Sequence, residues 1–157
     1  MGNKGYQNID SLNTSNYDES KNPYLLQFRA SIPVESAGNK IYISPFLNEP
    51  PSENPLKQVT RTYPVDFTYP FGRNFSSTIE IPQGYKVEFT PEPFKINNQM
   101  VSVDYQVFRS EVNKINVTGV YIFKKAVYDS EEYRNLKYIY NEIIKKFNEK
   151  VVLVKIE

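Results

Sequence analysis

Hydrophobic and polar residues alternate with a period of two along much of the chain. This alternation is typical of a β-strand that buries one face and exposes the other. The segments that show it, and are therefore predicted to be strands, are residues 24–34, 41–43, 60–69, 77–81, 85–89, 100–109 and 112–123. Short strands at this spacing, separated by turn residues, predict a mostly β fold: an antiparallel, Ig-like β-sandwich of about seven or more strands.

Prolines interrupt the alternation and predict where the strands end. Residues 44–56 contain four prolines, which remove amide donors and fix φ, so this segment is predicted to be a loop that Phe46 and Leu47 pin to the body. Pro64 lies inside the predicted strand 60–69 and indicates an edge strand or a bulge. Residues 70–74 are predicted to turn the chain.

The hydrophobic period changes to three and four residues after residue 128. This spacing predicts one amphipathic helix, whose buried face is formed by Tyr133, Leu136, Tyr140, Ile143, Ile144 and Phe147. Asp129 and Glu132 precede it with the spacing of a capping box, Asp replacing Ser or Thr. Residues 151–156 are largely apolar and predict a final strand that pairs inside the fold.

Residues 1–22 show neither period. Asn, Ser, Asp, Lys and Gly dominate, and the apolar residues are scattered, so the segment buries too little surface to offset its ordering entropy. We therefore predict a flexible arm or linker over residues 1–22 and a single β-sandwich domain over residues 23–157.

The charge composition argues against two classes of partner. Basic residues number 19 and acidic residues 18, so the net charge is +1 and no basic patch for nucleic acid is predicted. No stretch approaches the roughly 20 apolar residues of a spanning helix, and no membrane insertion is predicted. The first residues are polar and lack the apolar core of a signal peptide, so any export signal is expected outside this sequence.

The chain contains no cysteine and no histidine. This excludes Ser-His-Asp and Cys-His catalysis within it, as well as disulfides and zinc–thiolate sites. A carboxylate pair of the glycosidase type is the remaining catalytic alternative, but the acidic residues on predicted strands mostly alternate outward. Neither a calcium loop nor a phosphate-binding glycine motif is present. We predict no catalytic residue, metal site or cofactor, and no enzymatic activity.

The 13 tyrosines and 10 phenylalanines leave two interpretations open. In the first, they fill the core of a protein that has no tryptophan. In the second, aromatic side chains near turns contact a ligand or partner, for which the candidates are Phe46, Tyr69, Phe71, Arg73 and Phe75. The second interpretation makes a glycan-binding module the alternative function.

Several short motifs occur in an order that resembles one family. They are Ile41-Tyr42-Ile43-Ser44-Pro45-Phe46, Asn54-Pro55-Leu56-Lys57, Arg61-x-Tyr63-Pro64-Val65-Asp66-Phe67, Ile81-Pro82-x-Gly84-Tyr85-x-Val87-Glu88, Asn113-Lys114-Ile115, Tyr133-x-x-Leu136 and the closing run 149–155. In this order, residues 24–157 resemble the C-terminal β-domain, a domain of unknown function, of bacterial exported transglutaminase-like proteins. Those proteins also have an N-terminal β-rich domain and a central papain-like core.

The resemblance implies a non-catalytic accessory or interaction domain of a larger exported transglutaminase- or protease-like protein. Its implied partners are the catalytic and N-terminal domains of the parent chain, and its implied location is extracytoplasmic, in the periplasm or cell envelope. The Cys-His-Asp machinery of such proteins belongs to the central core, and no part of it is carried over to this chain.

Overall fold

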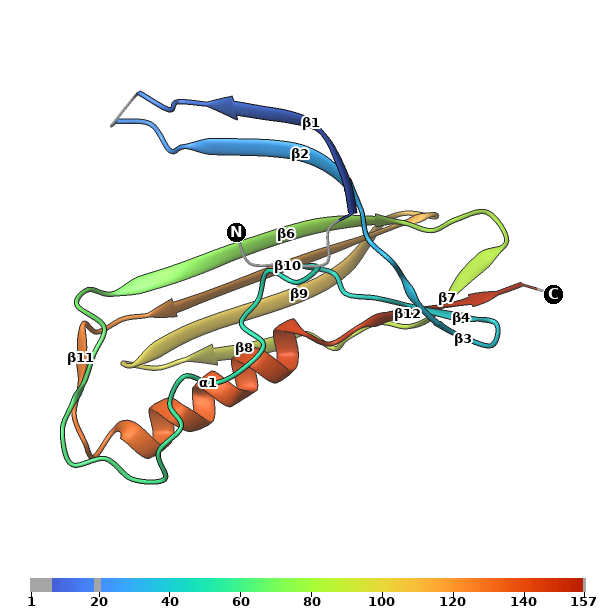
Figure 1. Ribbon diagram of the computed structural model, residues 1–157. Coiled ribbons are helices and arrows are strands. Elements are labelled where there is room, and N and C mark those ends of the chain that lie inside the picture. The colour runs from blue at the N-terminus through green and yellow to red at the C-terminus, as the bar shows by residue number, and fades with distance from the viewer. Residues whose placement is uncertain (1–6, 19–20, 157) are drawn as a thin grey trace. The chain divides into compact units, whose positions relative to one another are not determined.

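The computed structural model describes residues 7–18 and 21–156, and the chain divides into two compact units at the boundary between Glu35 and Ser36. The smaller unit is an antiparallel ribbon of β1 (Gln7–Ser15) and β2 (Leu25–Ser31) (Figure 1). Every residue of β1 is exposed. Part of the predicted arm thus forms a strand, and the predicted single domain over residues 23–157 spans the unit boundary. The flexibility of residues 1–22 stays a prediction, and residues 1–6 and 19–20 lie outside the described residues.

The larger unit contains two four-stranded antiparallel sheets, a short strand pair and one helix (Figure 1). The first sheet has the order β6 (Phe71–Glu80), β10 (Lys114–Phe123), β9 (Val101–Glu111), β8 (Phe94–Asn97). The second has the order β3 (Glu35–Ala37), β4 (Lys40–Ile43), β12 (Val151–Lys155), β7 (Tyr85–Phe89). β5 (Val65–Asp66) pairs with β11 (Val127–Tyr128), and α1 spans Tyr133–Phe147. The predicted mostly β class, with a single helix and a final strand, is confirmed.

A single hydrophobic core joins both sheets and α1. The one-sided burial predicted for residues 100–109 and 112–123 is confirmed, because alternate residues of β9 and β10 are buried from Val101 to Tyr105 and from Ile115 to Phe123. Helix α1 contributes Tyr133, Leu136, Ile139, Ile143 and Phe147, and β12 contributes Val151 and Leu153. The helix period therefore identified the buried face, although Tyr140 and Ile144 are half-buried and Ile139 takes a buried place. As predicted, β12 pairs inside the fold, between β4 and β7.

Gly119 lies at the centre of an aromatic cluster on the inner face of the first sheet. The strand register places Phe75 and Tyr105 opposite it on the two neighbouring strands. A Cβ atom added at Gly119 would lie 2.6 Å from Cε1 of Phe147 and 3.0 Å from Cε2 of Phe46. The absent side chain therefore makes room for one ring from the end of α1 and one ring from the loop after β4.

The predicted strand over residues 60–69 is wrong except at Val65 and Asp66. Pro64 has no amide donor, and Thr68 adopts a positive φ of 70°. The Thr68 amide donates a hydrogen bond of 2.6 Å to Oδ1 of Asp66, which turns the chain immediately after β5.

The predicted turn over residues 70–74 is also wrong, because β6 begins at Phe71 and pairs with β10 along its whole length without a register shift. A Cβ atom at Gly72 would lie 2.7 Å from the carbonyl oxygen of Tyr121, so this glycine permits close approach of two strands. β8 and β11 were not predicted, because segments of four and two residues are too short to display a period.

Glu132 holds the turn that leads into α1. Its Oε2 accepts a hydrogen bond of 3.0 Å from the Asp129 amide, and its Oε1 pairs with the Lys125 ammonium at 2.5 Å. The first contact resembles one half of the predicted capping box, but the N-cap residue of α1 is Glu132 and no side-chain hydrogen bond caps the helix, so the predicted N-cap role of Asp129 is wrong. The hydrogen bond from Lys125, and then that from the Asp129 amide, lower the pKa of Glu132.

Replacing Gly119 by alanine is expected to destabilise the larger unit by about 1–3 kcal/mol, since the added methyl overpacks the space held by Phe147 and Phe46. Urea unfolding measures the change. In a Phe147→Leu background, which removes the Cε1 and Cζ atoms that the methyl would meet, the same substitution should cost less. Equal costs in both backgrounds would show that the Phe147 ring does not restrict this position.

Replacing Glu132 by glutamine is expected to flatten the loss of stability on acidification. A carboxyl group whose pKa is lower in the folded state stabilises the fold above its unfolded pKa, about 4.3 for Glu, and loses that contribution as the pH falls through the folded pKa. Urea unfolding from pH 7 to about pH 3 should therefore show wild-type and E132Q stabilities converging at low pH. Glu131→Gln, an exposed neighbour, is the control, and parallel wild-type and E132Q curves would contradict the expectation.

Candidate functional site

The five predicted contact residues differ in exposure. Phe46 is only 5% exposed, Phe71 and Phe75 are half-buried, and Tyr69 and Arg73 are exposed. The Phe71 ring packs against Phe123, with ring centroids 5.0 Å apart, and so belongs to the core. The structure brings Phe46 and Phe75 together, with centroids 5.2 Å apart, and places Arg73 two residues before Phe75 on β6. A contact role for the five residues, and the glycan interpretation built on it, stay predictions.

A hollow of about 360 Å³ lies beside β6 and contains both of these rings in its wall. We call it the β6 hollow. Its lining residues are Pro45, Phe46, Leu47, Glu49, Asn74, Phe75, Ser76 and Ser77. Because four consecutive residues of β6 line it, the hollow runs along the edge of the strand and not over one face only.

The loop that forms the other wall is folded by its own backbone. The Leu47 amide donates to the Ser44 carbonyl at 3.0 Å, and the Glu49 amide donates to the Phe46 carbonyl at 3.2 Å. Leu47 has a φ of 55°, and its side chain is 44% exposed. Arg73 links the strand to this loop by a long hydrogen bond, 3.4 Å from its Nη1 to the Glu49 carbonyl.

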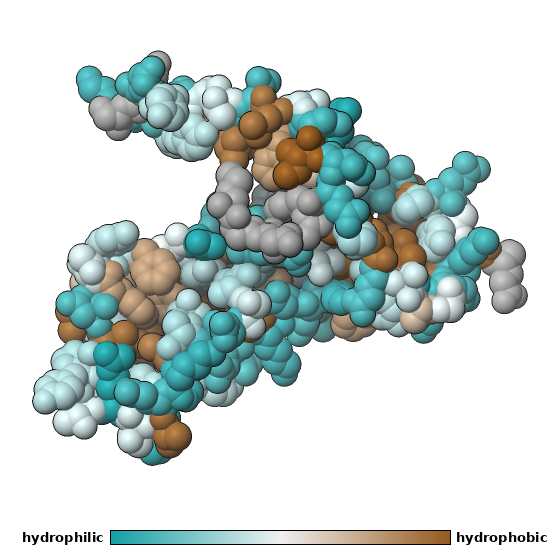
Figure 2. Space-filling view, viewed as in Figure 1, coloured by the Kyte–Doolittle hydropathy of each residue, from teal (hydrophilic) through white to brown (hydrophobic). Residues whose placement is uncertain are grey.

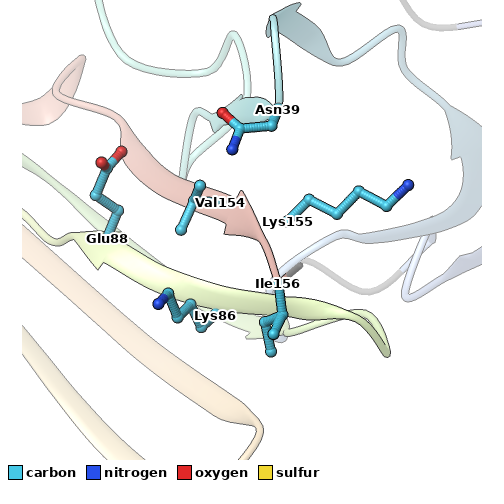
Figure 3. A pocket seen from close by; sticks show the side chains of 6 residues that line it. All are labelled: Asn39, Lys86, Glu88, Val154, Lys155 and Ile156. Atoms are coloured by element: carbon cyan, nitrogen blue, oxygen red, sulfur yellow. The ribbon is translucent and has the colours of Figure 1, made fainter.

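A second hollow, of about 590 Å³, lies on the second sheet and is lined by Asn39, Lys86, Glu88, Val154, Lys155 and Ile156 (Figure 3). Lys40 pairs with Glu88 at 2.8 Å, and this hydrogen bond raises the pKa of Lys40. Figure 3 shows the lining side chains spread along neighbouring strands without converging on one point. The arrangement presents paired surface charges and no set of groups aimed at a common ligand atom.

The most perturbed titratable groups of the described residues are core tyrosines. Burial raises the pKa of Tyr105, with a smaller contribution from Glu149. Burial also raises the pKa of Tyr121 to about 12, against the opposing charge of Arg73. Both phenols are therefore neutral at physiological pH. No group of three or more acidic side chains that could hold a metal ion occurs within residues 7–18 and 21–156.

What the β6 hollow offers is apolar contact and backbone hydrogen bonding. Its walls carry two aromatic rings, Pro45 and Leu47, and beside them runs a strand edge with hydroxyl and amide side chains. Leu47 was predicted to pin the loop to the body, but it is 44% exposed, so this prediction is wrong. As residues of a site, the sequence predicted Phe46 and Phe75 but missed Pro45 and Leu47. The detectable signal was the apolar trio at residues 45–47 in a segment that is otherwise polar and proline-rich. No sequence signal marks the second hollow, because Lys86 and Glu88 alternate with the half-buried residues Tyr85 and Val87 as ordinary outward charges of a strand do.

None of the helical structure in the described part of the chain has the length and hydrophobicity that a membrane crossing requires.

The fold and its elements define a mostly β domain that ends in a helix and a strand, and known proteins share this pattern. Residues 39–153 match the model of a family described as a domain of unknown function with a solved structure, DUF3858. Because the match covers more than half of the chain, the chain belongs to this family. No curated protein matches the chain.

A solved crystal structure from Parabacteroides distasonis ATCC 8503, described as that of a "putative protease", has a similar fold. The TM-score is 0.54 and the sequence identity is 14%, with 62% of this chain and 19% of that chain covered. At this identity the similarity shows the fold alone. The matched region spans about one fifth of the Parabacteroides protein.

Phe46→Ala and Tyr69→Ala are expected to distinguish a core residue from a surface residue among the five predicted contact residues. Removing the buried Phe46 ring should cost about 3–5 kcal/mol of unfolding free energy, whereas removing the Tyr69 ring, which is 65% exposed, should change it by no more than about 0.5 kcal/mol. Thermal and urea unfolding give both values. A small effect at Phe46 would mean that its ring is not part of the core in solution.

Proposed function

We propose that this chain is a non-catalytic accessory domain of a longer exported protein of the transglutaminase- or protease-like kind. The observation that carries the proposal is the Parabacteroides protein, in which the similar fold accounts for 19% of a much longer chain. The motifs at residues 41–46, 61–67, 81–88 and 149–155 add the resemblance to the C-terminal domain of transglutaminase-like proteins. On this proposal the natural partners are the catalytic and N-terminal domains of the same polypeptide, at an extracytoplasmic location.

Exposed apolar side chains support a docking role. Tyr63, Tyr69 and Val127 are all exposed and lie on or beside the β5–β11 pair. Figure 2 shows apolar surface at the end of the larger unit where Figure 1 places β11. Exposed apolar residues that gather at one end of a domain are typical of surfaces that another domain covers.

The chemistry of the chain supports a non-catalytic role. Cysteine and histidine, the nucleophile and general base of papain-like catalysis, are absent from the sequence. The perturbed phenols of Tyr105 and Tyr121 are held neutral by burial and offer no acid–base group near pH 7. A domain of this composition supports catalysis only by what it contacts.

An antibody raised against this domain is expected to detect a polypeptide much heavier than 18.3 kDa in fractionated cells of the source organism. The band should lie in the envelope or periplasmic fraction, because the proposal places the domain in an exported protein. A band near 18.3 kDa in the cytosol would contradict both parts of the proposal.

A further inference from the structure

Within the described residues of the larger unit, strand β6 is paired on one edge only, the edge that faces β10. It is the first strand in the order of its sheet, and its ten residues pair with β10 alone. Within residues 36–156 of the larger unit, no backbone hydrogen bond joins the other edge of β6 to a second segment. Such an edge presents a row of unpaired amide and carbonyl groups at the spacing of a β-ladder.

The other sheet edges of the larger unit are shorter than β6 and carry charges within their length, or have only three residues. The two charged residues of β6, Arg73 and Glu80, lie outside its central residues 74–79. β8 is four residues long, contains Lys95 and follows the Pro91-Glu92-Pro93 segment. β7 carries Lys86 and Glu88, and β3 has only three residues. In β6, residues 74–79 contain no charge and no proline, and the pairing with β10 has no bulge. Lysines, prolines, bulges and short length are the features that commonly protect natural sheet edges from added strands. Residues 74–79 of β6 have none of these features.

The β6 hollow lies along this same edge. A strand added to β6 would place every second side chain on the inner side of the sheet, where Phe75, Phe46 and Leu47 form the apolar wall. On the added strand, the residue opposite Phe75 and the residue opposite Arg73 would be two positions apart. Arg73 is exposed and positively charged. Main-chain pairing with a pocket for alternate side chains is the arrangement by which sheets bind extended peptides.

We infer that the β6 edge binds an extended segment of the parent polypeptide by strand addition. The segment carries an apolar residue opposite Phe75, seated in the β6 hollow, and an acidic residue two positions away, opposite Arg73. This deepens the proposed function and rests on it for the source of the segment. The positive charge of Arg73 favours an acidic residue at the opposite position of the segment. The matched fold covers only 19% of the Parabacteroides protein, and the remaining length supports a segment that comes from the same polypeptide.

The test uses the complete 157-residue chain and two labelled heptapeptides, acetyl-Thr-Thr-Leu-Thr-Glu-Thr-Thr-amide and its reversed sequence, because the strand direction is open. Fluorescence anisotropy should show saturable binding of one of them. The binding peptide is then made in two versions, each with methyl groups on one of the two sets of alternate backbone nitrogens. The version whose methylated nitrogens face β6 should no longer bind. If neither peptide binds, or if binding survives both methylation patterns, the inference is overturned.

Substitutions in the chain then test the two side-chain contacts. Leu47→Asn should weaken binding about tenfold or more by removing apolar wall, while the left-handed backbone at residue 47 suits Asn and preserves the fold. Val112→Asn, at a fully solvent-facing hairpin turn, is the matched control and should leave binding unchanged. Arg73→Gln should weaken the Glu peptide but not its Gln counterpart. Equal losses for both peptides, or equal effects of the two Asn variants, would overturn the side-chain assignment.

Sedimentation of the chain alone tests a second copy as the occupant. Ser76→Lys places a charge at the β6 edge, and Gln106→Lys places one in the same cross-strand row two strands inward. A dimer that is abolished by Ser76→Lys but not by Gln106→Lys would overturn the inference in favour of self-pairing. The peptide assay does not depend on the parent protein. Peptide binding with a stand-alone cytosolic polypeptide would defeat the proposed function and the parental source of the segment, but not strand addition at β6. An envelope band of high mass without peptide binding would defeat only the inference.

Discussion

The contact of two aromatic rings with the bare backbone of Gly119 positions the rest of the larger unit. Phe147 is the last residue of α1, and β12 begins four residues later. Phe46 follows the end of β4 by three residues. Since Val151 of β12 pairs with Ile43 of β4, both rings stand next to the same strand pair of the second sheet. One close approach on the first sheet therefore fixes where α1 and β4 end and where β12 starts.

The same packing shapes the candidate site. Phe46 reaches Gly119 on one side and lines the β6 hollow on the other. The hollow is thus a by-product of how the loop after β4 is anchored, and its rigidity comes from the core. A site built in this way offers a fixed surface to a partner, which suits a domain whose proposed role is contact and not chemistry.

The hydrophobic period of the sequence predicted the elements that bury one face over several residues. The β9–β10 hairpin, α1 and the inward β12 could be read from the sequence because each repeats its burial over several residues. The turn assigned to residues 70–74 failed because Gly72 looked like a turn residue, whereas its role is close strand contact that only the partner strand reveals. Two of the eight residues that line the β6 hollow, Phe46 and Phe75, were predictable because they are aromatic and lie near turn residues. The edge of β6 was not, because pairing on one side only is a property of topology.

The position of β12 has a consequence for how the domain acquires its structure. β12 lies between β4 and β7, yet it follows both in the sequence, by more than 100 residues in the case of β4. A chain synthesised from its N-terminus exposes β4 and β7 as separate strands until α1 and β12 emerge. The second sheet cannot close gradually, and its formation is a late, long-range event of the kind that slows folding. Until that event the second sheet lacks the strand that joins β4 to β7, whereas all four strands of the first sheet are already present.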